Sequence, residues 1–406
     1  MCTPISLLKL KPTWIFVKSV LFLFAIEKCE KSVIIIYGDY MYYRNFCGEK
    51  VFPLGFGCMR FPLKDDAPDI PEVNKILRHA IDEGVNYIDT AYFYHGGKSE
   101  EIVGNALEGG YRDKVLLATK MPIGMVKSAE DFDKIFAEQL QRLKTDHIDC
   151  YLFHAVNLER WENVVLKFGL IEKMNSLKRD GLVKFIGFSF HDTLSAFKRV
   201  VTEYEGCDFC QIQLNYIDVN NQAGIDGLKF ASQHGLSVVI MEPLLGGKLA
   251  EPGSDVLEVL GKDKTAARHG FEFLWDMEEV SVVLSGMSSA TQVEENLKTA
   301  KESKIGMLSE QERNSFKLAK KVYDSHRPIA CTGCSYCMPC PSGVDIQQTF
   351  KFCRDYAERT YFSALDKYKE MGRPADKCVA CKACEQQCPQ KLEISTLMKE
   401  IKEYYE

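Results

Sequence analysis

Eight short apolar segments, each followed by a segment with helical periodicity, constrain the fold of this 406-residue chain more than any other feature. Several are apolar almost throughout, and such strands occur in parallel sheets whose two faces are covered by helices. From Met41 onward the sequence therefore predicts alternating strands and helices. The predicted strands are Phe52–Gly57, Asn86–Ala91, Lys114–Lys120, His147–His154, Val183–Phe190, Phe209–Tyr216, Leu236–Pro243 and Val280–Met287.

The segments between these strands have the spacing of amphipathic helices. In Pro71–Gly84 apolar residues recur at i, i+3, i+4, i+7 and i+8, which places them on one helix face. Eight such strand–helix units over roughly 260 residues predict an α/β fold, a (β/α)₈ TIM barrel. An open doubly wound sheet would carry a Gly-x-Gly-x-x-Gly turn after its first strand, and Gly55–Arg60 lacks the third glycine.

The composition, with 46% hydrophobic and 27% charged residues, is that of a folded globular protein. A net charge of −6 gives no basic surface for a phosphate backbone, so we expect no nucleic-acid partner. Before Met41, the apolar stretch Trp14–Ile26 is interrupted by Lys18 and is shorter than the roughly 20 residues of a membrane helix. We expect no membrane span. Residues 1–40 are interpreted as an N-terminal extension, either a translation start assigned too early or a weak leader.

Four polar side chains stand where three of the predicted strands end. Asp89 lies at the end of the second strand and Tyr94 follows it by five residues, while Lys120 and His154 end the third and fourth strands. Catalytic groups of such barrels lie at the C-terminal ends of the strands, so these four side chains should converge on one rim.

The sequences around these residues resemble the aldo/keto reductase family, whose catalytic tetrad is an aspartate, a tyrosine, a lysine and a histidine in these positions. The resemblance covers roughly residues 41–300, and its motifs are Asp89-Thr-Ala-Tyr-Phe-Tyr94, Leu117-Ala-Thr-Lys120 and Asp149-Cys-Tyr-Leu-Phe-His154.

Each residue type suits the delivery of a proton to a carbonyl oxygen. A tyrosine with a pKa near 10 is a poor donor at neutral pH, and an ammonium beside the phenol would lower that pKa. We therefore expect Tyr94 to donate the proton, Lys120 to lower the pKa of Tyr94, Asp89 to hold Lys120, and His154 to hydrogen-bond the carbonyl oxygen. The alternative is a structural ion pair between Asp89 and Lys120 beside two ordinary rim residues.

The resemblance also implies a NAD(P)H site, with cofactor positions at Gly57, Ser189, Gln213, Met241, Leu244, Glu295 and Asn296. Several of its positions depart from the family pattern. Phe190 replaces an asparagine, Met241 replaces an aromatic residue, and Glu242 stands near the expected pyrophosphate. Gly286 and Gln292 replace the usual basic residues, which grip a 2′-phosphate. A preference for NADPH is therefore not predicted, and a flavin is an open alternative.

Eight of the sixteen cysteines form two closely spaced runs near the C-terminus. This spacing is typical of metal ligands in a reducing compartment and not of a disulfide framework. On this ground we expect a cytoplasmic protein. The second run, Cys378, Cys381, Cys384 and Cys388 followed by Pro389, is the bacterial ferredoxin motif C-x₂-C-x₂-C-x₃-C-P. The first run, Cys331, Cys334, Cys337 and Cys340, has one residue fewer before its last cysteine.

In such motifs three cysteines bind one [4Fe-4S] cluster and the fourth binds the other cluster. We therefore expect Cys331, Cys334 and Cys337 to share a cluster with Cys388, and Cys378, Cys381 and Cys384 to share one with Cys340. Two Cys₄ zinc sites, or a single cluster on the second run, are the alternatives. The other eight cysteines, including Cys353, are expected to be ordinary thiols. Residues 319–406 are thus predicted to form a small, mainly helical, ferredoxin-like 4Fe-4S domain after a barrel of residues 41–318.

A barrel of this type fused to a dicluster domain resembles the iron-sulfur aldo/keto reductases of anaerobes. This implies an oxidoreductase that reduces a small carbonyl substrate and is coupled to iron-sulfur electron transfer, with a ferredoxin or other redox protein as a partner. A hydride carries two electrons while each cluster carries one, so coupling them needs a flavin, a radical step or two clusters emptied in sequence. A flavin- or ferredoxin-linked electron-transfer protein, and a catalytically idle barrel used as a binding module, are the alternatives.

Overall fold

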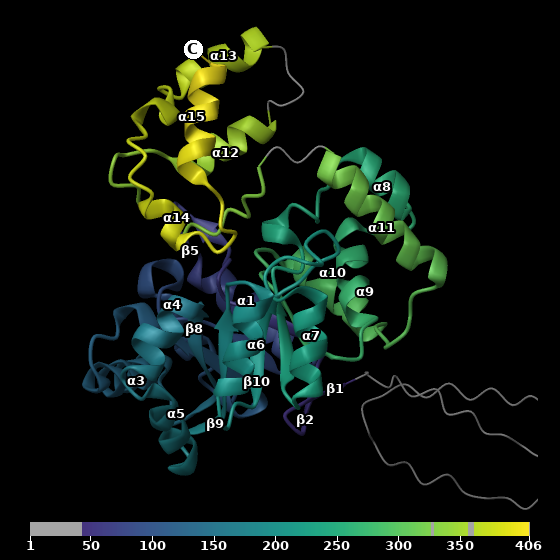
Figure 1. Ribbon diagram of the computed structural model, residues 1–406. Coiled ribbons are helices and arrows are strands. Elements are labelled where there is room, and N and C mark those ends of the chain that lie inside the picture. The colour runs from purple at the N-terminus through teal and green to yellow at the C-terminus, as the bar shows by residue number, and fades with distance from the viewer. Residues whose placement is uncertain (1–42, 326–328, 356–360, 406) are drawn as a thin grey trace, which may run out of the picture. The chain divides into compact units, whose positions relative to one another are not determined.

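The computed structural model describes residues 43–325, 329–355 and 361–405 (Figure 1). The predicted N-terminal extension, residues 1–40, lies outside them. Among the helices of these three ranges, none is both long enough and apolar enough to cross a bilayer.

Eight parallel strands close into a barrel in the order β10-β11-β12-β3-β6-β7-β8-β9. This confirms the predicted (β/α)₈ architecture. The strands are β3 (Leu54–Gly57), β6 (Tyr87–Asp89), β7 (Leu116–Met121), β8 (Ile148–Val156), β9 (Val183–Phe190), β10 (Phe209–Gln213), β11 (Ser237–Met241) and β12 (Val280–Ser285).

One principal helix follows each barrel strand, and these helices surround the barrel (Figure 1). In chain order they are α1 (Ile70–Asp82), α2 (Ser99–Ala106), α3 (Ala129–Leu143), α5 (Leu170–Arg179), α6 (Leu194–Glu203), α7 (Gly224–Gln233), α9 (Ala266–Trp275) and α10 (Ala290–Lys301). Helix α1 matches the predicted Pro71–Gly84 closely. The Asp69 side chain caps it by accepting a hydrogen bond from the backbone N–H of Glu72, and its apolar face is buried.

Six of the eight barrel strands end one to three residues away from the predicted last residue, and β10 and β8 are two of them. Strand β10 stops at Gln213 because the side-chain oxygen of Asn215 accepts hydrogen bonds from the backbone N–H groups of Ile217 and Asp218, which turns the chain. Strand β8 continues to Val156, two residues beyond His154, through an irregularity in its pairing with β9.

A hairpin of β1 (Arg44–Phe46) and β2 (Glu49–Val51) closes the N-terminal end of the barrel, and the sequence pattern did not predict it. Phe46 is fully buried and makes edge-on contacts with the rings of Tyr87, Phe185 and Phe209. Tyr87 and Phe209 begin β6 and β10, so Phe46 fills the bottom of the barrel core.

Helix α11 (Glu310–Ser325) lies alongside α8 (Ser254–Leu260) on the barrel (Figure 1). Phe316 and Ala319 are buried in one cluster with Tyr216 and Val256. The boundary expected between residues 318 and 319 therefore falls inside this helix.

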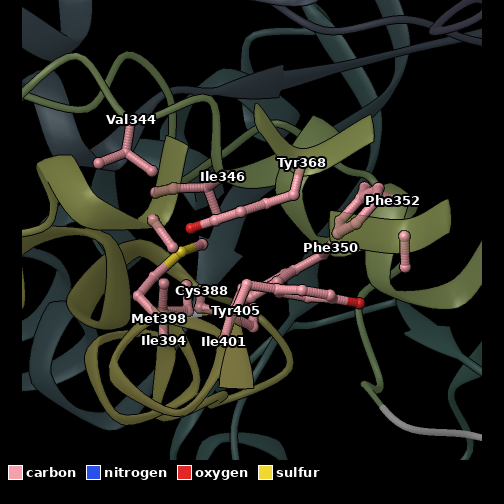
Figure 2. Packing of buried hydrophobic residues seen from close by; sticks show 12 residues of the cluster. Val344, Ile346, Phe350, Phe352, Tyr368, Cys388, Ile394, Met398, Ile401 and Tyr405 are labelled. Atoms are coloured by element: carbon pink, nitrogen blue, oxygen red, sulfur yellow. The ribbon is translucent and has the colours of Figure 1, made fainter. Parts of the chain in front are cut away.

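The C-terminal region is helical, with a hydrophobic core of its own. Side chains from its helices point toward one another around Tyr368, Phe352 and Tyr405, whose rings are in contact (Figure 2). Cys388 belongs to this core. The helices are α12 (Ile346–Asp355), α13 (Tyr361–Glu370), α14 (Ala383–Gln387) and α15 (Ile394–Tyr404).

Replacing Phe46 by alanine should lower the free energy of unfolding by about 3–5 kcal/mol, because a buried ring is removed from the closed end of the barrel. Urea unfolding followed by tryptophan fluorescence measures this loss. The control is Leu63→Ala, since Leu63 is 59% exposed and its loss should change the same free energy by less than about 0.5 kcal/mol. Equal effects of the two substitutions would contradict the assigned role of Phe46.

Candidate active site

The four tetrad residues meet at the C-terminal rim of the barrel. The ammonium of Lys120 donates to Oδ1 of Asp89 at 2.7 Å and to the backbone carbonyl of Thr90 at 2.8 Å. It also lies 5.1 Å from the ring centroid of Tyr94, whose ring is edge-on to the imidazole of His154 at 6.1 Å. The predicted convergence of the four side chains is therefore present.

Burial dominates the electrostatics of this group. Asp89 and Lys120 are almost fully buried, and burial raises the pKa of Asp89 while the neighbouring Lys120 opposes that rise. Burial, followed by the charge of Asp89, also holds the pKa of Tyr94 well above its usual 10. Burial outweighs any effect of the neighbouring ammonium, and the expected lowering of this pKa by Lys120 stays a prediction.

His154 is buried, and burial lowers its pKa well below 6.5, with further lowering by the positive charges of Lys120, His191 and Arg160. Its imidazole is therefore neutral at neutral pH. A neutral imidazole donates through one nitrogen and accepts through the other, so it can hydrogen-bond a carbonyl oxygen without transferring a charge.

Tyr336 is a site residue that the sequence analysis missed. It lies between Cys334 and Cys337, yet its hydroxyl is 3.4 Å from Nε2 of His154, and its ring stands edge-on to His154 and His191. Its side chain lines two cavities at the barrel mouth. No local pattern marks it, because its position depends on how the C-terminal region packs on the barrel.

The first of these cavities, about 150 Å³, contains the tetrad residues Asp89 and Tyr94. Of the seven predicted cofactor positions, four line this cavity: Gly57, Gln213, Met241 and Leu244. The other three do not. Ser189 accepts a hydrogen bond from the backbone N–H of Ala155, Asn296 donates to the hydroxyl of Ser285, and Glu295 is exposed on α10.

Gln213, one of the expected cofactor positions, is hydrogen-bonded within the protein. Its side-chain oxygen accepts from Gln222 at 3.2 Å and from Gln390 at 2.8 Å, and its amide nitrogen donates to Asp218 at 3.2 Å. Gln222 also donates to the backbone carbonyl of Pro389. The segment after Cys388 is thus tied to the loop that follows β10.

Charged groups of the first cavity include Arg60 and Glu242. One carboxylate oxygen of Glu242 is buried without a hydrogen-bond partner among the described residues. Burial raises the pKa of Glu242, and the charge of Arg60 opposes the rise. The side chain of Arg60 packs over Gly286, where a Cβ would lie 3.1 Å from it. Arg60 thus covers a position from which the expected basic residue is missing, and no sequence signal indicated this.

The cysteines line two further cavities in the C-terminal region. One is lined by Cys331, Cys334, Cys337 and Cys388, and the other by Cys340, Cys378, Cys381 and Cys384. Each run therefore gives its last cysteine to the other cavity, which is the crossed arrangement expected from the sequence. Apolar side chains such as Phe350, Ile394 and Met398 complete the walls.

The barrel and the C-terminal region each match a known protein family. The model of the aldo/keto reductase family matches residues 53–313, more than half of the chain. The chain belongs to this family. The model of a 4Fe-4S dicluster domain matches residues 330–392. This family member is therefore an oxidoreductase of the aldo/keto reductase type that carries an iron-sulfur domain.

Two curated relatives are similar over the barrel. An uncharacterized oxidoreductase of Bacillus subtilis is 26% identical over 310 residues, which cover 68% of this chain and 95% of the relative. The L-galactose dehydrogenase of Arabidopsis thaliana is 28% identical over 288 residues, which cover 65% of this chain and 89% of the relative.

Solved structures share the fold. The holo form of an aldo-keto reductase from Bacillus halodurans is 24% identical with a TM-score of 0.58, covering 69% of this chain and 96% of that one. An aldo/keto reductase from Klebsiella pneumoniae, solved in complex with NADP and acetate, is 24% identical with a TM-score of 0.57. The match covers 69% of this chain and 95% of that one.

The lowered pKa of His154 predicts that this imidazole stays neutral from pH 8 down to below pH 6. Histidine NMR signals recorded across this range should include one that does not titrate and that disappears in His154→Gln. The same residue in urea-unfolded protein, freed from burial, should titrate near 6.5. A His154 transition between pH 6 and 7 in the folded protein would contradict the assignment.

Proposed function

We propose that the protein reduces the carbonyl group of a small molecule at the barrel rim, with Tyr94 as the proton donor, and that the C-terminal domain links this site to iron-sulfur electron transfer. The observation that carries the proposal is the buried ion pair of Lys120 and Asp89, set beside Tyr94 and His154. The pair is costly to bury, and four such side chains rarely meet at strand ends for structural reasons alone.

Each residue of the tetrad has a different role toward the carbonyl oxygen of the substrate. The Tyr94 phenol is protonated at neutral pH, but its raised pKa makes it a weak acid, so proton transfer needs a positive charge beside the ring and an oxygen that gains negative charge. Lys120, held by Asp89, places a positive charge beside the ring from which that proton leaves. Neutral His154 orients the carbonyl oxygen toward Tyr94 by a hydrogen bond.

A nicotinamide dinucleotide would lie in the first cavity, and when bound it supplies a hydride. Aldo/keto reductases of Klebsiella pneumoniae have been solved with NADP and with NADPH, which supports this choice. Gly57, Met241 and Leu244 would line its site. Arg60 provides a positive charge for its phosphates, and the same charge faces the carboxyl group of Glu242, which lies in this cavity.

The eight clustered cysteines would hold two [4Fe-4S] clusters, which when bound transfer single electrons. In the described ranges no three His, Cys, Asp or Glu side chains converge closely enough to hold one metal ion. A zinc ion needs its sulfurs about 2.3 Å away on all sides, whereas each thiolate of a [4Fe-4S] cluster binds a different iron. The spacing therefore supports clusters rather than zinc.

An electron-transfer protein without carbonyl reduction is a second candidate, and the hydrogen bond from Gln390 to Gln213 favours it. This contact occupies a group that the reductase would use to hold the carboxamide of a nicotinamide. Anaerobic mixing distinguishes the two candidates: NADPH should bleach the cluster absorption or support carbonyl reduction if the reductase proposal holds. If only a reduced ferredoxin bleaches the clusters and no carbonyl is reduced, the second candidate is favoured.

Tyr94→Phe removes the proposed proton and should lower kcat for carbonyl reduction by at least about 100-fold, while the iron content stays unchanged. Steady-state assays with a panel of small aldehydes and ketones measure this loss. Tyr111→Phe is the matched control, because Tyr111 hydrogen-bonds Asp82 away from the rim and should retain full activity. Full activity in Tyr94→Phe would refute the role of Tyr94.

The crossed cysteine arrangement predicts which cluster each ligand supports. Cys388→Ser should disturb the cluster of the first run and Cys340→Ser that of the second, each lowering iron from about eight toward about four per chain. Iron analysis and electron paramagnetic resonance of the reduced protein measure this. Cys353→Ser is the control and should keep all iron. If Cys388→Ser instead perturbs the cluster of its own run, the pairing is uncrossed.

A further inference from the structure

The second cavity at the barrel mouth, also about 150 Å³, adjoins the tetrad at His154. Barrel residues such as Phe93 and Ile123 form one side, and Cys388 and Lys391 from the C-terminal region form another. Tyr336 lines this cavity as well as the first. A carbonyl oxygen held by His154 would therefore place the rest of a small substrate in or beside this space.

The charged side chains that line this cavity are all cationic. Arg160 and Lys391 belong to its walls, and no aspartate or glutamate does. Within the part of the chain that the structure describes, neither cation forms an ion pair with an acidic side chain. A pocket with two unneutralised positive charges favours an anion.

Arg160 is held in place without losing its capacity to bind. Its backbone N–H donates to the side chain of Asn157, which caps the short helix α4 (Leu158–Arg160). Its guanidinium donates to the carbonyl of Ala155 and to the side chain of Gln387, each at 3.1 Å. A guanidinium has five N–H donors, so others remain for a ligand.

His191 adds a second sign of a polar ligand. Its Nδ1 is buried and lacks a hydrogen bond of ordinary geometry among the described residues, although the side chain of Gln222 lies near enough to raise its pKa. Its side chain lines the cavity, and burial together with the charges of Arg160 and Lys391 lowers its pKa to about 4. His191 therefore adds a buried polar side chain to the same wall as the two cations, and a polar ligand could accept a hydrogen bond there in place of Gln222.

We propose that this cavity binds the carboxylate of an anionic carbonyl substrate, with Arg160 and Lys391 holding the charge while His154 holds the carbonyl oxygen. The inference rests on the proposed carbonyl reduction and names its substrate class, the oxo acids. The carboxylate is unchanged in the reaction and serves to position the substrate. Arg160 comes from the barrel and Lys391 from the C-terminal region, so both regions contribute to the site.

The same two cations could instead offset the negative charge of a cluster, because Cys388 lines this cavity too. The two explanations predict different measurements. Loss of an anion site weakens binding of an acid but not of its uncharged ester. Loss of a countercharge shifts the reduction potential of the cluster and leaves the difference in binding between the acid and its ester unchanged.

The test uses the full chain with its clusters, as wild type, Arg160→Gln and Lys391→Gln. Binding of 2-oxobutanoate, 4-oxopentanoate and their methyl esters is measured by calorimetry, and cluster potentials by anaerobic titration. Lys382→Gln is the matched control, since this exposed lysine neighbours the other cysteine cavity. We expect Kd for at least one acid to rise about tenfold or more in each cavity variant, with esters and control within about threefold.

Acids and esters binding equally well to the wild type would overturn the inference. So would a shifted cluster potential in the variants with unchanged Kd for both acids. Turnover of the same compounds is measured separately. If acids bind more tightly than esters but no compound is reduced, the anion site is supported and the proposed reductase function is contradicted. If esters and acids are reduced alike and the variants leave Kd unchanged, the reductase function is supported and the anion site is contradicted.

Discussion

The exchange of the last cysteine between the two runs is the constraint on which the C-terminal region depends. Cys340 must reach the cavity of the second run and Cys388 that of the first, although 47 intervening residues, among them α12 and α13, separate them in sequence. The chain must therefore double back on itself. With few residues available for a core, a region of this size needs such internal ties, and its hydrophobic cluster forms around Cys388 rather than apart from it.

This folding back also explains the composition of the barrel mouth. Two short segments of the C-terminal region reach it: the loop that carries Tyr336, and the turn after Cys388 that carries Gln390 and Lys391. Each is adjacent to cysteines of the same cavity. These segments make hydrogen bonds to side chains that the family pattern assigns to the binding of cofactor and substrate. The barrel mouth therefore has polar contacts that a barrel without the C-terminal region would lack.

Sequence reasoning succeeded where the signal is local. Apolar runs gave the eight strands, and the residues ending them gave the tetrad, because strand direction alone puts Asp89, Lys120 and His154 on one rim. It failed where the outcome depends on contacts between distant segments. Strands as short as β1 and β2 have no readable period, Tyr336 meets a histidine 182 residues away, and the pKa of Tyr94 depends on burial that no motif encodes. The roles of the tetrad and the cysteines remain predictions that the geometry supports.

The placement of Tyr336 and Gln390 bears on how the two regions are joined. A chain ending at residue 325 would keep all eight strands and the whole tetrad, yet both cavities would lose a wall. The C-terminal region therefore does more than follow the barrel in sequence: it completes the walls of both cavities. Both regions line the same two cavities, so a change of side-chain volume on one side of a cavity alters the space that the other side encloses.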